Sequence, residues 1–258
     1  MFAGLKALIG RTCDRMFPRA WIAFRILRRD RNFEPEYWLV PRYCDPSKTA
    51  IDIGANMGEY SYLMARHARD VVAFEPNAVL NPALRRRLPS NVRIEPFALS
   101  REAGTVAFRV VAGNTGVATI EPGNALGMIE DPSTVETRQV ETRTLDSFSL
   151  ADVSLIKIDV EGHEEAVIDG ALETLARCRP ALLIESEDRH NAGAPNRLIR
   201  RLAAANYDAF VLRSGALVPI SAATATHYNY VFLPKDRPRT TTTTEKMPSD
   251  HSPHHRVP

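Results

Sequence analysis

The segment Thr49–Tyr60 (TAIDIGANMGEY) constrains the fold more than any other part of the chain. Ala50–Ile53 has the apolar, β-branched composition of a buried strand, and Gly54–Gly58 follows as a tight turn. Apolar residues spaced by three and four then predict a helix over Glu59–His67. A strand that leads through a glycine turn into a helix presents free backbone N–H groups to a nucleotide-type ligand. The segment therefore predicts an α/β fold with a nucleoside site at this turn.

The spacing of the small residues distinguishes between nucleotide ligands. Dinucleotide-binding folds carry Gly-x-Gly-x-x-Gly at this point. Here an acidic strand end precedes small residues at alternate positions: Asp52, Gly54, Asn56 and Gly58. A second acidic residue, Glu75, ends the strand predicted over 70–75, about 20 residues after the first glycine, where a carboxylate is placed to bind ribose hydroxyls. The alternative is that Glu75 caps a helix before Pro76.

Length and composition narrow the class of protein. A chain of 258 residues with 44% hydrophobic content can bury the core of one α/β domain, and a net charge of +2 gives no reason to expect a nucleic-acid partner. Cys13, Cys44 and Cys178 are scattered, odd in number and without metal spacing, which indicates reduced thiols in a cytoplasmic protein. No apolar run approaches the roughly 18 residues of a membrane span.

The chain divides into three parts. Residues 1–47 form a basic, helical prefix, 48–234 the main domain with an insert at about 101–145, and 235–258 a Thr/Pro/His-rich tail predicted to be disordered. We expect the prefix to be a lid packed on the domain. The alternative is an interfacial helix that makes the protein membrane-peripheral by holding it at anionic lipid. No feature of the sequence indicates an oligomeric state.

The predicted core is a mostly parallel, seven-stranded sheet with helices on both faces. Strands are expected over 50–53, 70–75, 92–94, 155–159 and 180–185, with an antiparallel pair over 208–213 and 228–233 at the end. The insert breaks the alternation of strand and helix, and residues 105–111 and 135–145 read as an antiparallel hairpin or flap. Such loops at the carboxyl ends of strands shape the acceptor pocket in α/β folds.

A third motif follows the insert. The strand over 155–159 ends in a run of polar residues that includes Asp159, Glu161 and His163, and the next strand ends in Glu185. Because the carboxyl ends of parallel strands converge on the ligand crevice, we expect these side chains near Asp52.

Taken together, Ile51–Gly58, Phe74–Asn77, Thr144–Asp146 and Ile156–Glu164 resemble the FkbM family of methyltransferases over roughly residues 49–187. The resemblance implies a Rossmann-like class I fold, S-adenosylmethionine as cofactor, and O-methylation of a sugar hydroxyl in a glycan, glycolipid or glycosylated metabolite. It also implies that Asp52 lies near the methionine ammonium, that the glycines make room for the cofactor, and that Ala98 with Leu99 lies on the adenine side. The expected cofactor-binding residues are Asp52, Gly54, Asn56, Gly58, Glu75, Pro76, Ala98 and Asp159.

Methylation of a hydroxyl requires removal of its proton. His163 is the candidate base because imidazole titrates near neutral pH, although a histidine at this position can equally be a locally bonded residue at a helix N-terminus. Asp159 is expected to bind cofactor or to orient His163. A rival mechanism uses Asp159, Glu161 and Glu185 as Mg²⁺ ligands, which we do not expect. Two further functions stay open: a non-catalytic nucleoside-binding module of a glycan-assembly complex and a nicotinamide-dependent oxidoreductase.

Overall fold

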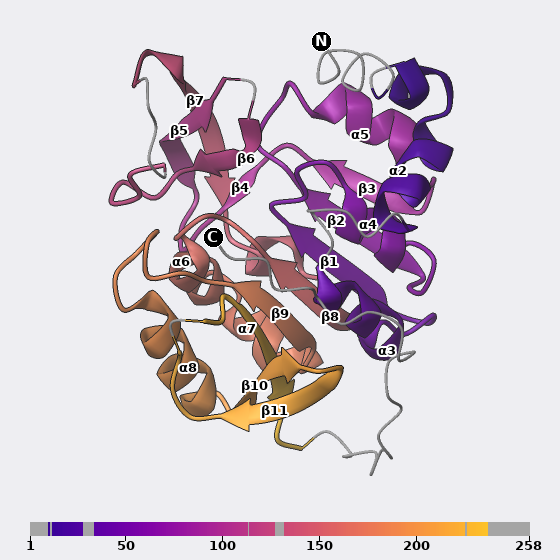
Figure 1. The fold of residues 1–258 in the computed structure, drawn as a ribbon. Helices are drawn as coiled ribbons and strands as arrows, with labels where there is room; N and C mark the ends of the chain where they lie inside the picture. Colours follow the sequence, from indigo (N-terminus) through magenta and orange to yellow (C-terminus); the bar gives the residue numbers. More distant parts are fainter. Residues whose placement is uncertain are drawn as a thin grey trace, which may run out of the picture.

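The computed structural model describes residues 10, 12–27, 34–112, 114–126, 132–224 and 226–236. Its centre is an eight-stranded sheet (Figure 1) made of β1 (Thr49–Ile53), β2 (Asp70–Phe74), β3 (Val92–Glu95), β8 (Val153–Ile158), β9 (Ala181–Glu185), β10 (Tyr207–Arg213), β11 (Ala216–Ile220) and β12 (Asn229–Pro234). The order across the sheet is β11-β10-β12-β9-β8-β1-β2-β3. Neighbouring strands among β3, β2, β1, β8 and β9 pair in parallel. Strand β12 runs antiparallel to both of its neighbours, β9 and β10.

The predicted fold class is confirmed, but the sheet has one strand more than the seven predicted. The additional strand, β11, turns back from β10 through Ser214 and Gly215, both at positive φ, and pairs antiparallel with β10 alone at the edge of the sheet. Its Pro219 argues against a central strand but is tolerated at an edge, where no second neighbour needs its N–H. The predicted antiparallel pair at the end of the domain is β10 with β12.

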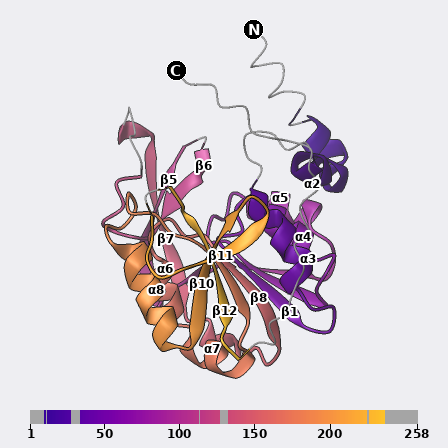
Figure 2. The same cartoon turned by 60° about the horizontal axis from the view of Figure 1, so that its bottom comes forward.

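The two faces of the large sheet are both covered, which explains the nearly continuous apolar runs of its central strands. One core packs residues such as Ile51 and Ile158 against α6 (Glu164–Asp169), α7 (Leu172–Cys178) and α8 (Ala194–Ala204). The opposite core packs residues such as Ala50 and Leu183 against α3 (Val40–Tyr43) and α4 (Glu59–Met64). Figure 2 shows these two groups of helices on either side of the sheet.

The insert forms a second sheet rather than a single hairpin. Its order is β4-β7-β5-β6, from β4 (Ala98–Leu99), β5 (Gly104–Val111), β6 (Asn114–Thr119) and β7 (Val135–Arg143). The predicted hairpin is present as the antiparallel pair β5–β7. This sheet stands at the carboxyl ends of the parallel strands (Figure 1), where it can close one side of a site.

The described part of the prefix is helical and packs on the domain. A helix over residues 12–16 is followed, after Phe17, by α2 (Pro18–Leu27), which buries Ile22 against α5 (Asn81–Arg87). The later part of the prefix holds η1 (Pro35–Leu39) and α3. Residues 1–9, 11, 28–33 and the tail beyond Asp236 lie outside the described residues. Of the helices in the described ranges, none has the length and apolar character needed to cross a bilayer.

Candidate active site

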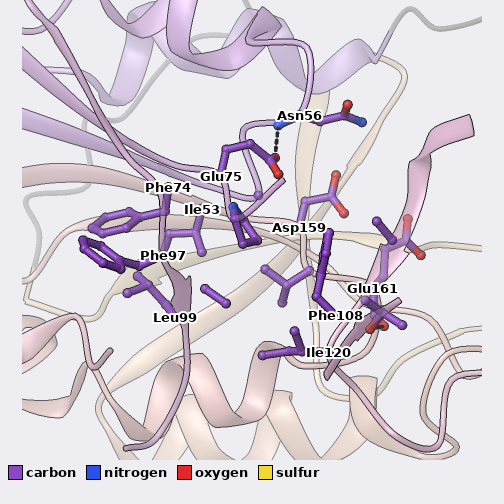
Figure 3. Close-up of a pocket in the computed structure, with 16 residues that line it drawn as sticks. Ile53, Asn56, Phe74, Glu75, Phe97, Leu99, Phe108, Ile120, Asp159 and Glu161 are labelled. Atoms are coloured by element: carbon purple, nitrogen blue, oxygen red, sulfur yellow. Dashed lines mark hydrogen bonds between the residues drawn. The ribbon is translucent and has the colours of Figure 1, made fainter. Parts of the chain in front are cut away.

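A cavity lies at the carboxyl ends of β1, β2 and β8, beneath the small sheet. It is lined by Ile53, Gly54, Asn56, Phe74, Glu75, Pro76, Phe97, Ala98, Leu99, Phe108, Ala118, Thr119, Ile120, Asp159, Val160 and Glu161. Six of the eight expected cofactor-binding residues belong to this lining; Asp52 and Gly58 do not. In Figure 3, Phe74 and Phe97 lie toward one end of the cavity, whereas Phe108 lies toward the other end, near the carboxylates of Asp159 and Glu161.

The glycine turn is shaped by close approaches of the backbone. Gly54 has a φ of +81°, and a Cβ at this position would lie 1.9 Å from the carbonyl oxygen of Asp159. The turn of β1 is thereby pressed against the end of β8, and only glycine fits between them. Gly58, with a φ of +87°, faces α5 instead, where a Cβ would lie 2.9 Å from Leu84 Cδ2. Gly58 therefore makes room for helix packing, and the structure places it outside the cavity.

Glu75 is a buried carboxylate held by two backbone amides. Its Oε2 accepts a hydrogen bond from the Asn56 N–H at 2.7 Å, and its Oε1 accepts one from the Asn77 N–H at 2.7 Å (Figure 3). Burial raises the pKa of Glu75 to about 7, although these two hydrogen bonds favour the charged form. Each oxygen keeps one further acceptor position, so the group can still bind a diol.

Asp52 lies behind the turn. It is buried, and its Oδ2 accepts a hydrogen bond from the Ser61 hydroxyl at 2.5 Å. Burial raises the pKa of Asp52 to about 6, against the hydrogen bond from Ser61 and the charge of Lys157. Asp52 therefore fixes α4 to β1 through Ser61 and adds negative charge beneath the cavity.

The apolar end of the cavity depends on residues that the sequence reasoning missed. Phe97 precedes β4, and the Arg143 guanidinium lies 3.7 Å from the centre of its ring. Phe97 also approaches Phe148, which packs edge-on against Phe74. Phe108 of the small sheet lines the same cavity. Flat aromatic walls of this kind suit a planar base such as adenine.

A buried lysine connects the carboxylates at the ends of β8 and β9. Lys157 is 1% exposed, its Nζ lies 3.7 Å from Asp159 Oδ2 and 3.9 Å from Glu185 Oε2, and it has no hydrogen-bond partner within the described ranges. Nζ also lies 5.1 Å from the centre of the Tyr60 ring. Burial raises the pKa of Glu185 to about 8, reinforced by the charge of Asp159 and opposed by that of Lys157. A lysine within an otherwise apolar strand was the available signal for this ion cluster.

The loop after β8 is held in an uncommon conformation by the small sheet. Glu161 has a φ of +54°, and its carbonyl oxygen accepts hydrogen bonds from the Thr119 hydroxyl at 2.9 Å and the Asn124 amide at 2.6 Å. Its carboxylate lies 2.9 Å from His190 Nε2. Burial lowers the pKa of His190, but the hydrogen bond and the charge of Glu161 outweigh it, so the pKa is raised overall. His190 and Asn124 were not singled out from the sequence.

His163 does not line the cavity. It lies directly before α6, with Nε2 at 3.0 Å from Ser100 Oγ and Nδ1 at 3.0 Å from Glu121 Oε2. Both ring nitrogens are therefore engaged by the protein. This geometry favours the alternative of a locally bonded residue over the base predicted for this position.

The candidate metal ligands of the rival mechanism lie in two different groups of ion pairs. Glu161 faces His190, whereas Asp159 and Glu185 face Lys157. In the part of the chain that the structure describes, no three His, Cys, Asp or Glu side chains are grouped to hold a metal ion. Of the three candidates, Asp159 and Glu185 approach a common partner, the Lys157 ammonium, and Glu161 does not.

A parallel α/β sheet with an antiparallel strand near one edge, a glycine turn after β1 and an acidic residue ending β2 define a Rossmann-like class I methyltransferase. The family model described as the methyltransferase FkbM domain matches residues 52–209, which is more than half of the chain. The chain therefore belongs to the FkbM methyltransferase family.

Solved structures with similar folds share little sequence with this chain. The methyltransferase FkbM from Methylobacillus flagellatus KT is 16% identical with a TM-score of 0.49, and the match covers 73% of this chain and 44% of that one. This chain thus spans less than half the length of that protein. An rRNA methylase from Streptococcus thermophilus is 11% identical, with a TM-score of 0.45 and coverage of 78% and 93%. A comparison with curated proteins finds no match.

Proposed function

We propose that the chain is an S-adenosylmethionine-dependent methyltransferase that methylates a sugar hydroxyl in a glycan, glycolipid or glycosylated metabolite. The observation that carries this proposal is the two-ended cavity, in which aromatic walls lead past the Glu75 carboxylate to Asp159 and Glu161. S-adenosylmethionine consists of an adenine, a ribose and a positively charged end, and the acceptor meets the cofactor at that charged end. The cavity offers an environment suited to each of these parts in the same order.

The residues present fit the cofactor. Phe74 and Phe97 offer apolar contact for adenine, Glu75 offers acceptor positions to the ribose hydroxyls, and the turn at Gly54 brings backbone within reach of the ligand. When bound, the cofactor supplies an electrophilic methyl group on a positively charged sulfur. The carboxylates of Asp52 and Asp159 make this end of the site favourable for positive charge.

The polar end of the cavity suits an uncharged, hydroxyl-rich acceptor. Carboxylates outnumber the single buried ammonium of Lys157, and carboxylate oxygens accept hydrogen bonds from sugar hydroxyls. The same charge repels the phosphates of nucleic acids. Asp159 is our candidate proton acceptor, because its carboxylate lines the cavity whereas His163 does not. A hydroxyl becomes strongly acidic as its oxygen gains a bond to carbon, so a carboxylate can take its proton at that moment.

Calorimetric titration with S-adenosylhomocysteine and with NADH tests the cofactor. We expect the chain to bind S-adenosylhomocysteine and not NADH. Binding of NADH alone would indicate a nicotinamide-dependent oxidoreductase instead. Transfer of radiolabelled methyl groups to cell-surface glycans, with nucleic acid as the comparison, tests the acceptor. Mass spectrometry of glycans from a deletion strain identifies it.

The variant Asp159→Asn should lower turnover at saturating S-adenosylmethionine by roughly 10²–10⁴, a larger loss than the weakening of cofactor affinity that removal of this negative charge also brings. A chain that binds S-adenosylhomocysteine but transfers methyl to neither class of acceptor would instead be a non-catalytic binding module.

A further inference from the structure

Helix α2 is apolar on two opposite faces. The inner face uses Ile22, which is buried, and Ile26, which is partly buried, and both belong to the cluster formed with Leu84 and Leu88 at α5. Through this contact the described part of the prefix packs on the domain.

That opposite face carries exposed apolar side chains. Ala20, Phe24 and Leu27 recur at intervals of four and three, which places them along one side of α2, and Phe17, the residue directly before α2, stands three positions ahead of Ala20; we call these four residues the outer stripe. Phe17 is 63%, Phe24 47% and Leu27 78% exposed, and the neighbouring Met16 is 64% exposed. A helix at the surface normally turns polar residues outward, so an apolar outer face indicates a surface with a function. Figure 2 shows α2 on the outside of the molecule, beyond α5 and α4.

The surroundings of the outer stripe are positively charged. Arg15 and Arg19, in the same segment of the chain, are exposed. The nearby acidic side chains are paired, since Asp14 lies 2.6 Å from Arg87 and Glu59 lies 2.8 Å from Arg25. Among the described residues 12–27, the charged side chains in the exposed class are thus arginines, and the adjoining α5 adds exposed Arg85 and Arg86.

We propose that the outer stripe of α2 inserts into the headgroup region of an anionic lipid bilayer. Phenylalanine, methionine and leucine side chains flanked by arginines suit the boundary between acyl chains and negatively charged headgroups. The arginine stems can lie along the apolar surface while their guanidinium groups reach lipid phosphates.

The position of α2 links this surface to the cavity. Arg25 of α2 pairs with Glu59, the first residue of α4. Arg87 of α5 pairs with Asp14 of the prefix and also donates a hydrogen bond to the Met57 carbonyl at 3.3 Å. These contacts connect the prefix to the glycine turn. Binding to lipid does not depend on the proposed reaction. It would, however, bring lipid-linked acceptors to the side of the molecule on which the cofactor turn lies.

Co-sedimentation of the full chain with vesicles tests this inference. Vesicles that contain phosphatidylglycerol should bind the chain at least about tenfold more strongly than pure phosphatidylcholine, with the difference lost at high salt. The double variant Phe17→Ser/Leu27→Ser should lower binding to the anionic vesicles by about tenfold or more, because it removes two large apolar side chains from the lipid contact. Arg15→Glu/Arg19→Glu should lower it by a similar factor. Leu172→Ser, which replaces a 47% exposed leucine on α7, is the matched control and should bind like the wild type.

Three results would overturn the inference: no binding to either vesicle, equal binding to both, or unchanged binding of the Phe17→Ser/Leu27→Ser variant. Light scattering adds a fourth. If the wild type is a dimer that this variant converts to monomers, the outer stripe is a contact between copies of the chain. Thermal unfolding followed by circular dichroism checks that each variant folds, and since the outer stripe is exposed we expect melting temperatures within a few degrees of the wild type.

Discussion

The affinity for S-adenosylhomocysteine is expected to fall steeply as the pH drops below about 7, because Glu75 must be ionised to accept hydrogen bonds from the ribose hydroxyls. Burial raises the pKa of Glu75 in the free protein to about 7, and the hydrogen bonds from the Asn77 and Asn56 amides only partly offset this effect. The ligand selects the deprotonated form. Its dissociation constant therefore rises as the pH falls through this pKa.

The magnitude follows from proton linkage. Each pH unit below the pKa adds 1.36 kcal/mol to the cost of ionising the carboxylate, so the affinity at pH 5.5 should be about 30-fold lower than at pH 8. Calorimetric titration between these pH values measures the slope directly. Asp52 and Glu185 lie at the same end of the sheet, and burial raises their pKa values to about 6 and about 8. Their titration would add to the pH dependence of the affinity.

Two variants isolate the contribution of Glu75. Glu75→Ala should weaken binding at pH 8 by about 1.5–3 kcal/mol and flatten the pH dependence. Glu164→Gln is the control, since burial also raises the pKa of Glu164 to about 7 but the side chain does not line the cavity. A wild-type affinity that is constant over this range, or a slope that survives in Glu75→Ala, would show that Glu75 serves only to fix the turn.

Two further predictions concern residues around the cavity. Above pH 7, Glu164→Gln should raise the free energy of unfolding, measured in urea, by roughly 3 kcal/mol. Burial raises the pKa of Glu164 in the folded state from 4.5 to about 7, so the wild-type protein loses stability as the pH rises through that interval. If the variant is no more stable than the wild type at pH 8.5, this reasoning is wrong. His163→Ala should lower the melting temperature, because the ring joins Ser100 to Glu121, yet keep turnover within about tenfold; a loss of 10²-fold or more would restore His163 as the base.

The features predicted correctly from the sequence are those encoded locally. The strand, turn and helix around Gly54, and the position of Glu75 at the end of the next strand, follow from periodicity and spacing over some 20 residues. The glycines illustrate the limit of this approach, because one motif contains two with different duties. Gly54 makes room for the backbone at the end of β8, whereas Gly58 makes room for side chains at α5. Only the tertiary contacts reveal this difference between the two glycines.

The features that were missed depend on contacts between distant segments. Lys157 meets Asp159 on its own strand but Glu185 only because β8 and β9 are neighbours in the sheet. Asn124 and Thr119 reach the Glu161 carbonyl across 37 and 42 residues of chain, from an insert whose fold no local pattern defines. For the same reason, the sequence suggests His163 as a base but does not show that both of its ring nitrogens are bonded to other side chains, Ser100 and Glu121.

The position of β12 affects how the chain can fold during synthesis. This strand is the last of the domain, yet it lies inside the sheet, between β9 and β10. Until Asn229–Pro234 has left the ribosome, β9 and β10 each present an unpaired edge, and hydrophobic residues such as Leu182 and Val211 lack the side chains of Tyr230 and Phe232 beside them. The parallel half of the sheet can form early, but the domain closes in one late step. A truncation before Asn229 should therefore yield a chaperone-bound or aggregating chain rather than a shortened native domain.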